Sequence, residues 1–263
     1  MENRPPPEAK RSVTDYFTGL ADGYAAYRPG YPPEAIATAL EGLARPVRVA
    51  DVGCGTGICS RLLAEAGAEV IGLEPNADML AVARRHPPPV TGRIAYRLAG
   101  AEDTGLPDDS VDLVICAQAF HWFDAPAALA EFRRILVSGG GRLALLWNRR
   151  DQSDRFMAGY EEVMRRAQDD AEAQGKRTGR SRSYDPSLGG LFTNVRQFVF
   201  ANPQKLDRAS LVGRARSASY FPKTGPLHEA LEDRLHSLFD EHERDGFITF
   251  RQNAELTIAE AER

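Results

Sequence analysis

Short apolar runs alternate with amphipathic segments through the middle of the chain. Residues 111–117 are almost continuously apolar, as expected for a parallel strand that is covered on both faces. The pattern predicts, in order, strand 47–53, helix 58–66, strand 69–74, helix 76–85, strand 93–98, strand 111–117, helix 125–136 and strand 142–147. This alternation is typical of βαβ units and predicts an α/β fold with a mostly parallel sheet.

The pattern changes beyond residue 148. A polar segment, 153–173, favours a helix, and a cationic segment rich in glycine and serine, 174–187, predicts a loop. That loop is either a flap over a binding site or a solvated connection. Segments 195–200 and 247–258 are predicted as closing strands around a helix at 226–243, and no internal repeat is found.

Length and composition favour one domain. The chain has 263 residues, of which 43% are hydrophobic, enough for a full core. We expect a disordered start over 1–12 and a single domain over 13–263, with a core at 45–150 and flanking elements at 13–44 and 151–245. A net charge of −4 argues against a nucleic-acid groove as the main surface.

The cysteines and histidines limit which kinds of chemistry the sequence supports. The three cysteines, Cys54, Cys59 and Cys116, suggest neither a disulfide framework nor paired metal ligands, and they suit a reducing cytosol. The five histidines form no recognisable ligand cluster, so no metal is expected. Without an apolar leader or a run long enough to span a bilayer, we expect a cytoplasmic protein with no membrane partner.

The most informative motif follows the first predicted strand. Residues 47–57 run from a β-branched strand through Asp51 into three alternating glycines, Gly53, Gly55 and Gly57. Alternating glycines allow a tight turn and the close approach of a ligand to the main chain. The helix that follows would present free N–H groups to that ligand.

A carboxylate follows the second predicted strand. Glu74 lies 17 positions beyond Gly57, where a βαβ unit delivers an acid to the ribose hydroxyls of a nucleoside; an exposed acid at a strand end is the alternative. The nicotinamide fingerprint requires a third glycine where Ile58 stands. A ligand with one nucleoside and no pyrophosphate therefore fits this turn better than a dinucleotide.

Together these residues resemble a known family. The segment Asp51-Val-Gly-Cys-Gly-Thr-Gly57, followed by Glu74-Pro75-Asn76, is similar to the cofactor site of class I S-adenosylmethionine-dependent methyltransferases. Residues 117–124 and 24–32 resemble the small-molecule branch that contains trans-aconitate methyltransferase. The resemblance is strong over 15–150 and looser elsewhere. It implies a Rossmann-like, seven-stranded, mostly parallel sheet with helices on both faces, and helical N-terminal and C-terminal lid elements.

The resemblance also implies a cofactor, S-adenosyl-L-methionine, and the residues that hold it. The glycine turn would line the methionine part, Glu74 would bind the ribose, and residues after it would pack beside the adenine. Glu102 could instead be a surface acid, and Arg28 could bind the donor's carboxylate. The implied cofactor residues are Tyr24, Arg28, Asp51, Gly53, Cys54, Gly55, Thr56, Gly57, Glu74, Pro75, Asn76, Met79, Ala101, Glu102, Ala117 and Gln118.

The acceptor would meet the methyl group beyond the strand at 111–117. His121 is the candidate general base there, with a buried residue of the pocket wall as the alternative. If the acceptor is already an ionised carboxylate, positioning by cations matters more than removal of a proton. The candidates for substrate contact are Tyr16, Trp122, Trp147, Asn148, Arg149, Arg214 and Tyr220, with Arg216 as a further cation.

The sequence favours methyl transfer to a carboxylate or hydroxyl oxygen of a small molecule, by a monomer or homodimer. Three alternatives stay open at this stage. The same donor could undergo an internal displacement that releases methylthioadenosine, or the chain could be a nucleoside-binding module without catalysis. A nicotinamide oxidoreductase is disfavoured by Ile58 and by the lack of a Tyr-x-x-x-Lys pair.

Overall fold

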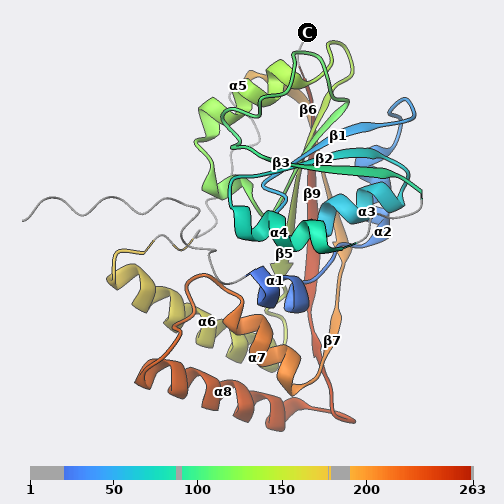
Figure 1. The fold of residues 1–263 in the computed structure, drawn as a ribbon. Coiled ribbons are helices and arrows are strands. Elements are labelled where there is room, and N and C mark those ends of the chain that lie inside the picture. Colours follow the sequence, from blue (N-terminus) through green and yellow to red (C-terminus); the bar gives the residue numbers. More distant parts are fainter. Residues whose placement is uncertain (1–20, 87–90, 177, 179–189, 262–263) are drawn as a thin grey trace, which may run out of the picture.

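A seven-stranded sheet forms the centre of the molecule. The computed structural model describes residues 21–86, 91–176, 178 and 190–261. The strand order is β3-β2-β1-β4-β5-β9-β6. Figure 1 shows the sheet with the helices around it. The strands of this sheet are β1 (Arg48–Val52), β2 (Glu69–Glu74), β3 (Arg93–Leu98), β4 (Leu113–Ala117), β5 (Arg142–Arg150), β6 (Phe192–Ala201) and β9 (Gln252–Ala261).

The first five strands run parallel, and β9 pairs antiparallel with both β5 and β6. The order reverses between β1 and β4, which opens a crevice at the carboxyl ends of these strands. The predicted α/β fold with a seven-stranded, mostly parallel sheet is therefore confirmed.

Helices cover both faces of the sheet. The helices are α1 (Ala21–Tyr27), α2 (Pro33–Leu40), α3 (Ile58–Glu65), α4 (Ala77–Arg85), α5 (Ala125–Ile135), α6 (Arg155–Ala173), α7 (Arg208–Arg216) and α8 (Pro226–His242). One apolar cluster joins α2 and α3 to one face, and a second joins α5 to the other. Burial of these two clusters stabilises the sheet and orients its carboxyl edge.

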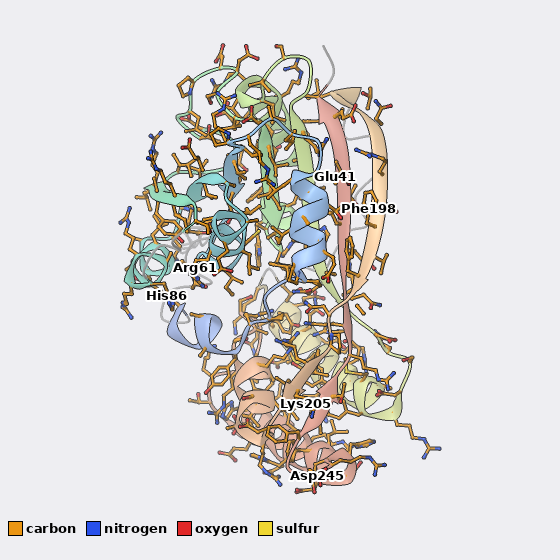
Figure 2. The ribbon with its side chains drawn as sticks, turned by 90° about the vertical axis from the view of Figure 1, so that its right-hand side faces the viewer. Glu41, Arg61, His86, Phe198, Lys205 and Asp245 are labelled. Carbon is orange, nitrogen blue, oxygen red and sulfur yellow. The ribbon has the colours of Figure 1, made fainter. Side chains whose placement is uncertain are left out.

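Helices α6, α7 and α8 lie below the sheet in Figure 1. Strands β7 (Gln204–Leu206) and β8 (Ile248–Phe250) pair antiparallel in a second sheet. A third apolar cluster joins this two-stranded sheet to α6, α7 and α8. We call these five elements the cap. In the side view, Lys205 and Asp245 lie at this end of the molecule, away from the part of the sheet that carries Phe198 (Figure 2).

The structure corrects two predicted strands and shows a helix that was not predicted. The predicted strand 247–258 is two strands, β8 and β9, which belong to different sheets because residue 250 is buried in the cap and residue 252 begins the pairing with β5. Strand β5 extends to Arg150 instead of ending at 147, since β9 pairs along its whole length. Helix α7 was not predicted, and its two faces differ little in polarity.

Several predictions fall outside the described residues. These include the disordered start at 1–12, Tyr16, and most of the predicted loop at 174–187. Tyr24 lies in α1, but its side chain is not among those described. In the part of the chain that the structure covers, no helix combines the length and the apolar character needed to cross a bilayer.

Candidate active site

A pocket of about 460 Å³ lies between the carboxyl edge of the sheet and the cap. Its size suits a small-molecule ligand. Loops after β1 and β4, the end of β5, and residues of α6 and α7 contribute to it. The lining residues used below are Arg28, Gly53, Cys54, Gly55, Thr56, Ala117, Gln118, His121, Trp122, Trp147, Asn148, Arg149, Arg150, Tyr160, Glu161, Arg214 and Tyr220.

The three glycines of the turn are required for different reasons. All three have positive φ, between +56° and +77°. A Cβ on Gly53 would lie 2.5 Å from Cβ of Ala119, and one on Gly57 would lie 2.3 Å from the hydroxyl of Tyr96. No atom lies within 4 Å of that position at Gly55, which lines the pocket. Only Gly55 therefore leaves room for a ligand; the other two leave room for protein atoms.

Asp51 is a fully buried carboxylate beside this turn. The hydroxyl of Ser60 donates to its Oδ2 at 2.5 Å, whereas its Oδ1 has no hydrogen-bond partner among the described residues. Burial raises the pKa of Asp51 to about 7, against the effect of the Ser60 hydrogen bond. Such an acceptor can receive a hydrogen bond from an ammonium or hydroxyl group of a ligand.

Glu74 ties the end of β2 to the glycine turn. Its carboxylate accepts hydrogen bonds from the backbone N–H of Gly55 at 3.0 Å and of Asn76 at 2.9 Å. The residue is 8% exposed, and burial raises its pKa. Because each oxygen accepts one of these bonds, each keeps capacity for a further donor, such as a ribose hydroxyl.

Asp51 and Glu74 lie beside the turn but outside the pocket lining, and so do the residues expected near the adenine. Asn76 caps α4 by accepting from the N–H of Met79 at 3.0 Å, and Met79 is buried in a small cluster with α1. Ala101 is buried, and exposed Glu102 accepts from the N–H of Asp124. Pro75 is exposed. Their proposed role in adenine binding stays a prediction.

Gln118 begins the loop that carries the candidate base. It has φ +59°, a left-handed conformation uncommon for residues other than glycine, and its side chain donates to the carbonyl of Asn148 at 3.3 Å. Asn148 in turn donates to the carbonyl of Gly30 and accepts from Asn202. These bonds join the ends of β4 and β5 to the N-terminal segment at the pocket floor.

His121 lies in an aromatic wall of the pocket, in the 3-10 turn η2 (Phe120–Trp122). Its ring centroid lies 4.9 Å from that of Trp122 and 5.3 Å from that of Trp147. All three rings line the pocket. The fold thus brings Trp147 onto the same wall as His121 and Trp122, although these two adjacent residues lie 26 and 25 positions earlier in the sequence.

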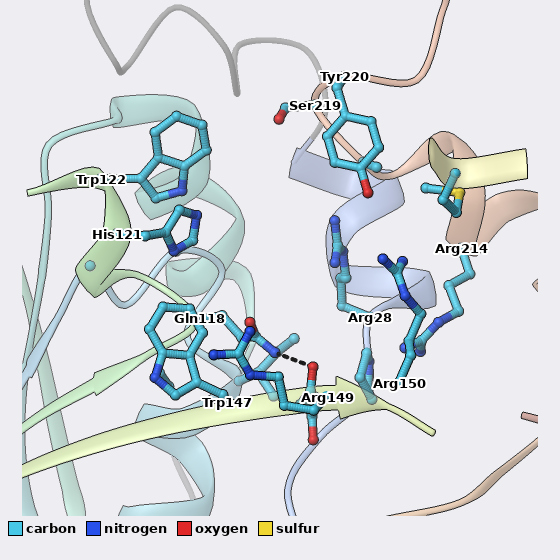
Figure 3. A pocket seen from close by; sticks show the side chains of 18 of the residues that line it. Arg28, Gln118, His121, Trp122, Trp147, Arg149, Arg150, Arg214, Ser219 and Tyr220 are labelled. Atoms are coloured by element: carbon cyan, nitrogen blue, oxygen red, sulfur yellow. Dashed lines mark hydrogen bonds between the residues drawn. The ribbon is translucent and has the colours of Figure 1, made fainter. Parts of the chain in front are cut away.

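Arginines form the opposite wall in Figure 3, where Arg28, Arg150 and Arg214 lie across from His121 and Trp122. Arg28 donates to the carbonyl of Ser217 at 3.3 Å. Arg150 forms an ion pair with Glu161 at 2.7 Å.

A fourth arginine also reaches the pocket lining. Arg149 lies 5.2 Å from the ring of Trp147 and pairs with Glu255 at 3.4 Å. The pocket thus has an aromatic wall and a cationic wall.

Sequence reasoning both missed and misplaced residues here. Arg150, Tyr160 and Glu161 line the pocket and were not predicted. The doubled arginine at 149–150 was the available signal, but the strand was predicted to end before it. Arg216 was considered as a substrate cation; it does not line the pocket and pairs with Glu232 on the cap surface.

Among the described residues, no group of three or more histidines, cysteines or acids is placed to hold a metal ion. The three cysteines are free and buried, and burial raises the pKa of each thiol. The polar groups that line the pocket are cationic and hydrogen-bonding side chains, together with the carboxylate of Glu161.

Comparisons with known proteins match this chain to methyltransferases. Residues 50–144 match the methyltransferase domain family. An uncharacterized methyltransferase of Mycobacterium tuberculosis is 41% identical over 144 residues, covering 55% of this chain and 56% of the relative. One from Schizosaccharomyces pombe is 28% identical over 233 residues, covering 86% of both chains. The chain thus aligns with little more than half the length of the mycobacterial relative.

Solved structures share the fold. A structure assigned as a type II methyltransferase from Anaeromyxobacter dehalogenans has a TM-score of 0.62 at 24% identity, covering 90% of this chain and 98% of the other. Phosphoethanolamine N-methyltransferase 2 of Haemonchus contortus, in complex with S-adenosylhomocysteine, has a TM-score of 0.54 at 16% identity, covering 97% and 61%. The chain therefore shares the fold of these methyltransferase structures, and its residues 50–144 match the methyltransferase domain family.

Proposed function

We propose that this protein transfers a methyl group from S-adenosyl-L-methionine to an oxygen of a small molecule. The observation that carries the proposal is the position of Gly55, whose open side faces a pocket that also contains an aromatic wall and a cationic wall. A donor seated at the turn and an acceptor in the pocket would share one cavity. The narrower likeness to the trans-aconitate branch remains a prediction.

The residues at the turn fit the donor. Gly55 provides the space, Asp51 has a buried oxygen without a hydrogen-bond partner among the described residues, and Glu74 ends the neighbouring strand with spare acceptor capacity. An ammonium and a ribose diol are the groups that such acceptors bind. The Haemonchus enzyme of the same fold, in complex with S-adenosylhomocysteine, supports the assignment.

When bound, S-adenosyl-L-methionine supplies a methyl carbon that is already activated by its sulfonium. The protein then has to orient the acceptor and exclude water. Trp122 and Trp147 would provide an apolar surface for the acceptor, and His121 would accept the proton of a hydroxyl group. A carboxylate acceptor would need orientation alone.

The first test concerns donor binding. Titration with S-adenosylhomocysteine should show saturable binding to the wild type, and Glu74→Ala should weaken it by severalfold to a hundredfold, since a charged hydrogen bond contributes roughly 1.5–3 kcal/mol. Glu69→Ala, which removes an exposed acid at the other end of the same strand β2, is the control and should bind as the wild type does. Tight binding of NAD in place of S-adenosylhomocysteine would contradict the proposal.

A second prediction concerns His121. Both His121→Ala and His121→Phe should reduce methyl transfer about a hundredfold while donor affinity is preserved, because general base catalysis contributes factors of roughly 10²–10⁴. The measurement is transfer of label from methyl-tritiated donor to the small-molecule fraction of a cell extract. Phe retains the aromatic wall, so full activity of His121→Phe would assign this residue a packing role.

The two remaining alternatives give different products. An internal displacement would release methylthioadenosine, which the mass of the nucleoside product distinguishes from S-adenosylhomocysteine. A module without catalysis would bind the donor and form neither product.

A further inference from the structure

The pocket has an excess of positive charge that the chain as a whole lacks. Its lining includes the arginines Arg28, Arg149, Arg150 and Arg214 but only one carboxylate, Glu161, whereas the whole chain has a net charge of −4. Like charges gathered in a partly desolvated cavity repel one another unless an anion joins them. The positive charge of the lining therefore favours the binding of an anionic ligand.

Arg214 is the pocket arginine whose charge is least compensated among the described residues. It is 8% exposed, and its guanidinium donates to the amide oxygens of Gln204 at 2.5 Å and Gln252 at 2.6 Å. It also lies 4.1 Å above the ring of Phe250. No carboxylate pairs with Arg214 among the residues that the structure describes. A buried cation held only by neutral groups is costly, and a stable protein usually pairs it.

The charged surroundings point the same way. Burial is the main reason that the pKa of Arg214 is lowered to about 10, and the like charges of Arg28 and Arg150 also lower it, while Tyr160 opposes the shift. An oxyanion bound between these guanidiniums would attract each of them and so offset their mutual repulsion.

The opposite wall has a different character. His121 and Trp122 lie across the pocket from Arg28, Arg150 and Arg214 (Figure 3). Trp147 completes this wall with Arg149 beside its ring, and none of the three aromatic side chains carries negative charge. An acceptor that spans the pocket would meet cations at one end, and aromatic rings with a candidate base at the other.

We propose that the acceptor is an organic acid whose oxyanion is anchored by Arg150 and Arg214 and whose uncharged hydroxyl faces His121. This inference rests on the proposed function. The fork of a guanidinium binds a carboxylate or a phosphate by two parallel hydrogen bonds, so the anion belongs to either class. The anion is the anchor, and the oxygen near His121 is a separate group.

The experiment measures binding by calorimetry in the presence of saturating S-adenosylhomocysteine. The probes are 4-hydroxyphenylacetate, 4-hydroxybenzylphosphonate and the neutral 4-hydroxyphenylacetamide. We expect the wild type to bind at least one of the two anions at least tenfold more tightly than the amide. Comparison of the two anions distinguishes a carboxylate from a phosphate-like group.

Two variants separate an anion anchor from a structural arginine. Gln204→Glu keeps Arg214 and gives its guanidinium a carboxylate partner in place of the amide oxygen. Because this carboxylate would compete with the ligand, anion affinity should fall at least tenfold, while the melting temperature is unchanged or higher. Arg214→Lys keeps the charge but loses the fork, and should weaken anion binding about fivefold. The matched control is Arg216→Gln on the same helix, whose side chain pairs with Glu232 outside the pocket; it should bind as the wild type does.

Either of two results overturns the anchor: equal affinity for the amide and the anions, or unchanged anion affinity in a folded Gln204→Glu variant. Should that variant fail to fold, Arg214→Lys provides the same comparison. Failure of S-adenosylhomocysteine to bind the wild type would instead remove the proposed function, which makes the two failures distinguishable.

Discussion

Gly53→Ala is expected to destabilise the protein by roughly 2–5 kcal/mol and to reduce both donor affinity and methyl transfer. A left-handed conformation is unfavourable for alanine by roughly 1–2 kcal/mol, and crowding of a packed site adds roughly 1–3 kcal/mol. The new Cβ would lie 2.5 Å from Cβ of Ala119, which has no flexible end to move aside. Since Ala119 immediately precedes the turn that holds His121, its displacement would disturb both halves of the site.

Denaturant unfolding measures the stability change, and Gly55→Ala is the matched control. Gly55 also has positive φ, but its Cβ would meet no atom within 4 Å, so only the backbone cost of roughly 1–2 kcal/mol applies. The double variant Gly53→Ala with Ala119→Gly should recover part of the loss. Equal destabilisation by the two single variants would show that the contact with Ala119 is unimportant.

Asp51→Asn is expected to remove a pH dependence of stability worth roughly 4 kcal/mol. The pKa of the buried carboxyl is about 7 in the folded protein and 3.8 as its ordinary value. Between these values the folded protein holds a proton that the unfolded chain has released. The free energy of unfolding should therefore fall as pH rises from about 4 to about 7 and then level off. The neutral amide of asparagine cannot contribute this fall and can still accept from Ser60.

The measurement is the free energy of unfolding of wild type and variant at pH 5 and pH 8. The difference, variant minus wild type, should be larger at pH 8. Asp112→Asn is the control: the Asp112 pKa is lowered by hydrogen bonds from Arg48, against burial, so that substitution should have the same effect at both pH values. A difference that is independent of pH for Asp51→Asn would show that this carboxyl ionises freely in the folded protein.

Much of the sheet could be predicted because its signals are local. Strands β2 and β3 and helix α8 lie within a residue of their predicted bounds, since apolar runs and helical periodicity depend on near neighbours in sequence. The cap was harder. Strand β9 was predicted as joined to β8, because nothing between residues 250 and 252 tells which sheet each residue enters.

The glycine turn and the acid beside it were predictable for the same reason. The glycine turn and Glu74 form one βαβ unit, and the motif is continuous in sequence. The acceptor half is assembled from four separate elements. Arg150 and Glu161 were missed because only the packing of α6 against the extended end of β5 brings them to the pocket.

The sequence alone determines the α/β fold and the tight glycine turn after the first strand, because both depend on residues close together along the chain. The tertiary structure alone decides that Arg214 is a buried cation beside neutral partners while Arg216, two residues away, is paired at the surface. Burial and ion pairing depend on which distant segments pack together, and no local pattern encodes that.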